Sequence, residues 1–318
     1  TAYMADITPP HKRTHRFGLI GAAFGLGFII GPVIGGELGE FGPRVPFFAA
    51  AGLAFANFLF GLLVLPESLP KASRRKFDIR RANPLGAVLS LKQYPTVLWL
   101  LAVLFFFQLA AQALPTVFSY FTVEVFSFTS STIGRTLGAF GLGFAISQAV
   151  IAGPLSRGIG EPAVAMIGLL AAVVAFAALG LSTDVYMLYL SVMVGAVSGL
   201  APPAINGVLS RQVPDNSQGE LQGAVNAASS LATIIGPLAA TQIFAYYTTM
   251  PGSPDYFPGA PFIAASASVV VALVLFAIAA WRFELGHRPS IANHPHAPEM
   301  APPGQVRVPP LEDDDRNP

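Results

Sequence analysis

The sequence predicts an all-α membrane protein, and its composition, its long apolar stretches and an internal repeat all support this fold class. Hydrophobic residues make up 53% of the chain and charged residues 11%, whereas about 25% of an ordinary soluble domain is charged. Eight apolar stretches approach or exceed the roughly 20 residues that an α-helix needs to cross a bilayer. They lie at 17–38, 45–65, 95–121, 132–153, 163–182, 186–208, 221–246 and 261–281.

The first and seventh of these stretches contain two copies of one helix sequence. Residues 18–32 and 223–237 are 205 positions apart and are identical at 8 of 15 positions. Each copy follows a polar loop, so both helices are expected to start from the same side of the membrane. Parallel internal repeats of this kind are typical of secondary transporters.

The distribution of basic residues over alternate loops predicts the orientation in the membrane. Of the 18 Lys and Arg residues, only Arg44 and Arg135 fall on one side. Because cytoplasmic loops carry an excess of Lys and Arg, we expect the segment before Phe17, the 66–94 loop and the C-terminus to be cytoplasmic. Trp99 and Trp281 lie near the cytoplasmic helix ends, where aromatic belts occur.

Four segments are expected along the chain. Residues 1–65 would form the end of an N-terminal helix bundle with two complete helices, and residues 95–282 a C-terminal bundle of six. The basic segment 66–94 between them is expected to be a cytoplasmic linker, or alternatively a solvated loop that only fixes the orientation. Residues 283–318 are rich in proline and end in acidic residues, so we expect a disordered cytoplasmic tail.

Composition and charge exclude several classes of function. The 18 basic and 17 acidic residues nearly balance, which gives no electrostatic support for binding nucleic acid. The chain has no cysteine, so thiolate catalysis, thiolate metal sites and disulfides are excluded. No cluster of acids, histidines or metal ligands could carry enzyme chemistry, and we expect neither an enzyme nor a cofactor or metal site.

Several motifs resemble the tetracycline/proton antiporter, or multidrug resistance exporter, branch of the major facilitator superfamily. They lie at 2–8, 16–18, 31–36, 46–51, 132–134, 139–141, 153–155, 158–161, 209–213 and 218–223. The resemblance covers about residues 1–282 and implies the major facilitator fold, with eight complete helices present out of an expected twelve. Because the chain begins without methionine, inside the expected end of an earlier helix at 1–7, we expect it to be truncated at its N-terminus.

The resemblance also implies a function and a location. It implies a monomeric secondary transporter in the bacterial inner membrane, with its C-terminus in the cytoplasm. Such a protein exports small amphipathic compounds or drugs by alternating access, in exchange for protons. A transporter-like sensor or scaffold without transport activity is the alternative.

Small residues on two of the apolar stretches predict a close helix contact. Gly27, Gly31 and Gly35 recur every four residues on one helix face, so a neighbouring helix can approach closely. Pro32 weakens the local backbone hydrogen bonding. The stretch 132–153 offers a matching face, and the resemblance implies that the two helices meet where rocking closes one entrance. Ordinary tight packing is the alternative. The residues assigned to this contact are Gly27, Gly31, Pro32, Gly35 and Gly36 on one helix, and Gly134, Gly138 and Gly141 on the other.

Four charged residues are candidates for gating roles. Glu37 and Arg135 lie near the outer ends of the same two helices, and we hypothesise that they form an ion pair that closes the outer side; alternatively, each snorkels separately. Arg157 lies in an expected cytoplasmic glycine turn, 153–160, which resembles the second copy of the superfamily's conformational motif. There it would face neighbouring helix ends, whose carbonyls attract cations. Asp6 has a family counterpart that pairs with an arginine.

Uncharged polar residues are the candidates for a substrate pocket. Gln108 and Gln112 lie one turn apart on one face of the 95–121 helix, which the resemblance places beside the central cavity. For each candidate, hydrogen bonding between helices without any ligand is the alternative. The further candidates are Gln148, Asn206, Asn226 and Ser229.

Proton coupling requires a titratable group that is exposed alternately to the two sides. No carboxylate or histidine falls at mid-membrane depth in the eight stretches. Where the antiporters carry a histidine in the eighth helix this chain has Phe144, and where they carry an aspartate in the ninth it has Ala172. Tetracycline itself is therefore not the expected substrate, and the coupling acid is expected upstream or in polar elements such as Asp6.

Overall fold

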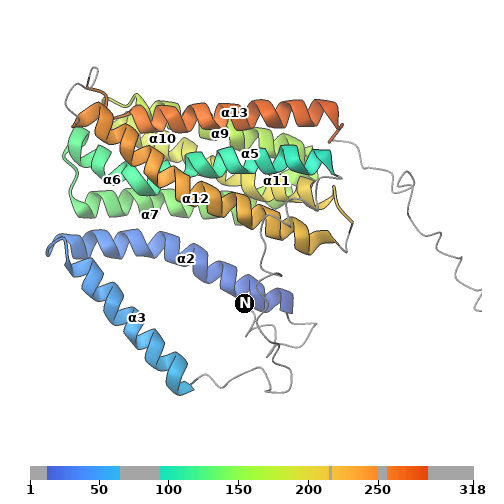
Figure 1. The fold of residues 1–318 in the computed structure, drawn as a ribbon. Helices are drawn as coiled ribbons and strands as arrows, with labels where there is room; N and C mark the ends of the chain where they lie inside the picture. Colours follow the sequence, from blue (N-terminus) through green and yellow to red (C-terminus); the bar gives the residue numbers. More distant parts are fainter. Residues whose placement is uncertain (1–12, 65–93, 215–216, 250–255, 286–318) are drawn as a thin grey trace, which may run out of the picture. The chain divides into compact units, whose positions relative to one another are not determined.

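The computed structural model describes residues 13–64, 94–214, 217–249 and 256–285, and they are almost entirely helical (Figure 1). The first two helices are α2 (Arg13–Gly39) and α3 (Val45–Val64). The helices that follow are α5 (Pro95–Ala111), α6 (Ala113–Phe126), α7 (Ser130–Ile146), α8 (Ala152–Ile159), α9 (Glu161–Gly180), α10 (Val185–Val197), α11 (Ala201–Ser210), α12 (Gln218–Thr248) and α13 (Ala260–Arg282).

Within these residues, seven helical stretches are long and apolar enough to cross a membrane. They are Val45–Val64, Pro95–Phe126, Ser130–Ile159, Glu161–Gly180, Val185–Ser210, Gln218–Thr248 and Ala260–Arg282. The eighth expected span, 17–38, falls within α2. The predicted fold class, an all-α membrane protein, is confirmed.

Three of the spans contain a break that the sequence did not predict. Gln112 separates α5 from α6, a π-helical segment η5 (Ser147–Ile151) joins α7 to α8, and a 3₁₀ segment η6 (Ser198–Leu200) joins α10 to α11. The two irregular segments η5 and η6 contact each other. Close packing accompanies these two segments, because a Cβ on Gly199 would lie 2.7 Å from the carbonyl oxygen of Phe144.

The predicted glycine turn at 153–160 is wrong. These residues are helical to Ile159, and the chain turns at Gly160, which has a φ of 86° that favours glycine. Pro154 does not end the helix, which continues from the π-helical segment through α8 to Ile159.

The helices from α5 to α13 share one apolar core. Helix α13 lies against α5 and α9, and α12 lies against α5. The largest fully buried side chains include Phe118, Phe121, Leu169, Phe262 and Phe276. Because lipid is as apolar as these side chains, close packing and hydrogen bonds between helices provide the stability. Ser266 Oγ donates to the carbonyl oxygen of Val173 at 2.9 Å and Ser268 Oγ to that of Phe106 at 2.8 Å.

Helices α2 and α3 join this core through one contact surface, because α2 packs along α7. Helix α3 contacts α2 and has no buried residue. Helices α2, α6 and α12 all finish at the same end of the molecule, at the left of Figure 1. We call it the Glu37 end.

A substitution at Gly134 tests the contact between α2 and α7. A Cβ there would overlap the carbonyl oxygen of Pro32 and lie 2.9 Å from Gly36 Cα, so Gly134→Ala is expected to push the helices apart. Overpacking of this kind costs about 1–3 kcal/mol. The variant is expected to lower the Tm measured by circular dichroism in detergent. Gly27→Ala is the matched control, because no described atom lies within 4 Å of its added Cβ. An equal fall of the Tm in both variants would contradict the described contact.

Candidate functional site

Backbone-to-backbone packing brings α2 and α7 together. A Cβ on Gly36 would lie 2.5 Å from the carbonyl oxygen of Ser130, and one on Gly141 would lie 2.9 Å from that of Phe28. A Cβ on Gly138 would overlap the Val33 side chain. All three glycines expected on α7, at 134, 138 and 141, therefore face α2, and each is required because any larger side chain would separate the helices.

The face of α2 that meets α7 differs from the predicted one. Among the described residues, no atom lies within 4 Å of a Cβ added at Gly27, Gly31 or Gly35. Pro32 and Gly36, two of the predicted residues, do meet α7, together with Ile29 and Val33. Ile29, Val33 and Gly36 recur at the i, i+4, i+7 spacing of a helix face. Consecutive residues point about 100° apart around a helix, so glycine spacing alone did not identify which of two adjacent small faces is used.

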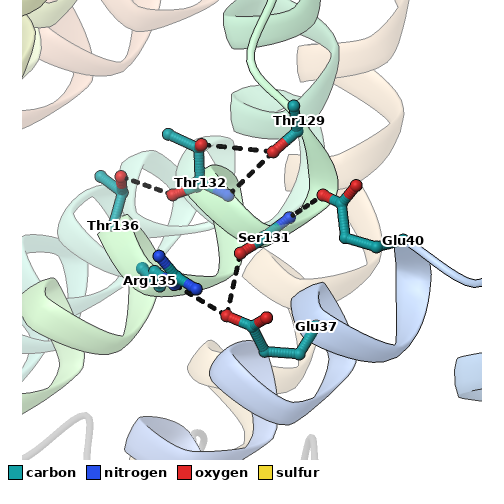
Figure 2. Close-up of polar contacts among 7 residues, drawn as sticks. All are labelled: Glu37, Glu40, Thr129, Ser131, Thr132, Arg135 and Thr136. Atoms are coloured by element: carbon teal, nitrogen blue, oxygen red, sulfur yellow. Dashed lines mark hydrogen bonds and ion pairs between the residues drawn. The ribbon is translucent and has the colours of Figure 1, made fainter.

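A polar cluster closes this contact at the Glu37 end (Figure 2). Arg135 Nε donates to Glu37 Oε1 at 2.7 Å. Ser131 Oγ donates to the same oxygen at 2.8 Å, and the backbone N–H of Ser131 donates to Glu40 Oε1 at 2.8 Å. Two carboxylates of α2 and the following turn thus meet the start of α7.

The position of these carboxylates has an electrostatic reason. The first N–H groups of a helix have no partner within the helix and carry a partial positive charge, so anions are stabilised there. Thr129 Oγ1 accepts from the N–H of Thr132, and Glu40 accepts from that of Ser131. The Arg135 and Glu37 side chains keep 69% and 45% of their surface exposed. Water and salt therefore screen the ion pair, and it can separate and re-form.

Glu40 and Ser131 were not predicted as site residues. The sequence signal was weak: Thr129 followed by serines is typical of a helix start, but nothing in it indicates which acid lies opposite. Asp6 lies outside the described residues. Arg157 lies exposed in the last turn of α8, and in the described part of the chain it forms no ion pair.

A second ion pair, also not predicted, lies where α9 begins and α11 ends. Arg211 Nη2 donates to Glu161 Oε1 at 2.6 Å. The Glu161 side chain is only 18% exposed, and a Cβ on Gly207 would lie 2.7 Å from Glu161 Cδ. An acid in the first turn and a base past the last turn both complement the helix dipoles, so this pair stabilises the fold of the α9–α11 region.

Three of the six predicted pocket residues lie around the contact of α5 and α6 with α12. Gln112 packs against Gly236, where an added Cβ would lie 2.6 Å from Gln112 Cβ. Its Nε2 lies 3.4 Å from Thr233 Oγ1, and Thr233 Oγ1 donates to the carbonyl oxygen of Ser229 at 2.9 Å. Asn226 is exposed on the same helix, one turn before Ser229.

The other three pocket candidates form no hydrogen bond to this group. Gln108 is half-buried one turn before Gln112. Gln148 is exposed in the π-helical segment. Asn206 on α11 is half-buried, and its Oδ1 is buried without a hydrogen-bond partner in the described part of the chain.

An apolar cavity between α6, α7, α9 and α10 is too small for a drug. Its volume is about 30 Å³, which is room for about one water molecule, whereas ligand pockets are roughly 300–1,000 Å³. Ala172, Phe176, Ser191 and Ser198 are among its lining residues.

A disulfide can test the Glu37 end directly, since the chain has no cysteine of its own. A Cβ on Gly39 would lie 2.8 Å from Ser130 Cβ, so Gly39→Cys with Ser130→Cys is expected to cross-link after a small adjustment toward the roughly 3.8 Å of a disulfide. Mass spectrometry of the oxidised protein measures the bond. Gly35→Cys with Ser130→Cys is the control that should not cross-link, and equal yields in both pairs would contradict the described packing.

Comparison with known proteins places this geometry in a family. The family model of the Major Facilitator Superfamily matches residues 1–147 and 106–310. The chain is 35% identical to the class C tetracycline resistance protein of Escherichia coli over 88% of this chain and 69% of that protein. It is 34% identical to the class E tetracycline resistance protein of Escherichia coli over 74% of this chain, and spans only 58% of that protein.

A solved structure with similar architecture is the human organic anion transporter MFSD10 (TETRAN). It is 26% identical, with a TM-score of 0.58 over 86% of this chain and 66% of that one. These relatives are transporters rather than enzymes. With the family model covering most of its length, this multi-pass membrane protein belongs to the Major Facilitator Superfamily.

Proposed function

We propose that the protein is a monomeric secondary transporter that exports small amphipathic compounds by alternating access, in exchange for protons. The observation that carries the proposal is the contact between α2 and α7: backbone packing along the helices, with an exposed ion pair at the Glu37 end. The names of the tetracycline resistance relatives support export of a small molecule. Tetracycline itself is not proposed as the substrate.

The arrangement in the membrane follows from the distribution of charge. In this proposal the Glu37 end faces away from the cytoplasm, and the C-terminus lies in the cytoplasm of a bacterial cell. Residues 1–65 end one bundle, 66–94 link it to the bundle at 95–282, and 283–318 form a tail. The α2–α7 contact then joins the two bundles, and separation of Glu37 from Arg135 opens the outer side.

Exchange for protons needs a carboxylate other than Glu37 and Glu40, which form the polar cluster at the Glu37 end. Ala172 is buried and lines an apolar cavity, so that position carries no proton. Phe144 packs over Gly199. The coupling acid is therefore proposed among the polar elements outside the described residues, such as Asp6. The same two apolar positions favour the second candidate, a sensor or scaffold without transport.

Transport by the purified protein in liposomes separates these two candidates. An imposed proton gradient should drive accumulation of a fluorescent amphipathic compound if the protein is an exporter, and a protonophore should abolish it. A sensor or scaffold gives no gradient-dependent accumulation with any of a panel of compounds.

Charge reversal tests the closure of the Glu37 end. Glu37→Arg and Arg135→Glu are each expected to reduce transport because like charges then face each other. The double reversal should restore transport only in part, since the arginine introduced on α2 would lie near the N-terminus of α7, where a cation is disfavoured. Arg44→Glu is the control, because Arg44 forms no ion pair in the described part of the chain. If the double variant recovers no transport, the pair of Glu37 and Arg135 does not close the outer side.

Gln112→Ala tests the proposed pocket. The hydrogen bond from Gln112 to Thr233 is long, at 3.4 Å, so the amide can turn to a solute. A lost hydrogen bond of about 0.5–1.5 kcal/mol weakens binding by roughly twofold to tenfold. The apparent KM for transport should rise by that factor. Gln242→Ala, at an exposed position of α12, should leave the apparent KM unchanged, and an equal rise in both variants would contradict the pocket.

A further inference from the structure

A carboxylate at the Glu37 end, that of Glu124, has a neutral hydrogen-bond partner. Glu124 is exposed in the last turn of α6, where the carbonyl end of the helix disfavours an anion and favours a cation. Across the described ranges, no Lys or Arg forms an ion pair with it. Its hydrogen-bond partner is the hydroxyl of Tyr256, which donates to Glu124 Oε1 at 2.5 Å. A phenol is neutral, so the negative charge stays uncompensated.

The end of α12 adds a second row of carbonyl groups close by. Tyr256 precedes Phe257, whose N–H donates to the carbonyl oxygen of Tyr247 at 3.2 Å, near the end of α12. The carboxylate of Glu124, with the burial around the hydroxyl, raises the pKa of Tyr256 to about 12. The hydroxyl therefore stays protonated at physiological pH and adds no second charge. Two helix C-termini and one carboxylate thus make this region attractive to cations.

Aromatic rings lie beside the carboxylate. Tyr120 precedes Glu124 by four residues, so both lie on one face of α6. Tyr120 and Tyr256 are 62% and 59% exposed, and the Tyr120 ring centroid is 6.1 Å from that of Phe244 on α12. Exposed ring faces attract cations of low hydration through their quadrupole.

We propose that Tyr120, Glu124, Phe244 and Tyr256, the Glu124 cluster, bind a lipophilic organic cation at the Glu37 end. The carboxylate supplies the charge and the rings supply an apolar and cation-attracting surface. The inference does not depend on transport, because it concerns equilibrium binding at a surface separate from Gln112. Aromatic residues that only anchor the helix ends in the membrane interface are the alternative.

Two probes of equal shape and opposite charge test the proposal. Equilibrium dialysis of the purified protein in detergent, corrected for empty micelles, measures binding of tetraphenylphosphonium and of tetraphenylborate. The protein is expected to bind the cation more tightly than the anion. Glu124→Gln should weaken cation binding by about fivefold to tenfold and remove the preference. Unchanged cation binding in this variant, or equal binding of both probes by the unsubstituted protein, would overturn the proposal.

Further variants separate binding from a structural role. Tyr120→Phe should keep cation binding and Tyr120→Leu should weaken it, because only the ring is required. Tyr256→Phe removes the hydrogen bond but not the charge, so cation binding should stay equal or become tighter. If Glu124 only anchors Tyr256, then Tyr256→Phe and Glu124→Gln will lower the Tm alike and neither will change cation binding, which refutes the site.

Asp184 and Tyr186 provide a matched control. Asp184 Oδ1 accepts the N–H of Met187 at 2.9 Å and caps α10, and Tyr186 is 86% exposed. Asp184→Asn and Tyr186→Leu should not change cation binding. A loss equal to that of Glu124→Gln would show a general surface-charge effect and overturn the proposal. Loss on Gln112→Ala with none on Glu124→Gln would place the cation in the proposed pocket instead.

Discussion

The approach of α2 to α7 at backbone distance is the constraint on which the arrangement of the helices depends. Three glycines of α7 face carbonyl groups and small side chains of α2, so no side chain separates the two helices. In lipid there is no hydrophobic driving force between helices, so close packing contacts of this kind are what holds them together. The polar cluster of Glu37, Glu40, Ser131 and Arg135 adds charged hydrogen bonds to the contact at the Glu37 end.

Helix dipoles explain where most of the charged groups lie. Glu37 and Glu40 face the start of α7, while Glu161 and Arg211 lie at the start of α9 and the end of α11. In each case the charge matches the partial charge of the helix terminus. Glu124 differs in its partner, since this carboxylate at a helix C-terminus accepts from a neutral phenol, whereas Glu37 accepts from Arg135.

Sequence patterns predicted the spans well and their internal breaks poorly. The length and apolar character of each stretch decide whether it can cross a bilayer, and both are local properties. The π segment after Ile146 and the 3₁₀ segment after Val197 depend instead on a packing contact between residues about 50 positions apart, which local patterns do not contain. For the same reason the sequence indicated that Pro32 and Gly36 meet α7, but not that Ile29 and Val33 do so in place of Gly27 and Gly31. Glu40 was missed because its partner is a backbone N–H, which has no signature in the sequence.

The π-helical segment between α7 and α8 has a consequence for how related chains are aligned. A π-helical turn holds one residue more than an α-helical turn, so the loss of a single residue anywhere in Ser147–Ile151 would leave a regular helix. Because the extra residue is accommodated within that one turn, the residues beyond it would keep nearly the same direction, and Arg157 would point to the same neighbours. Divergence in this part of the family is therefore expected to show itself as single-residue gaps, with both the identity and the direction of the cation preserved.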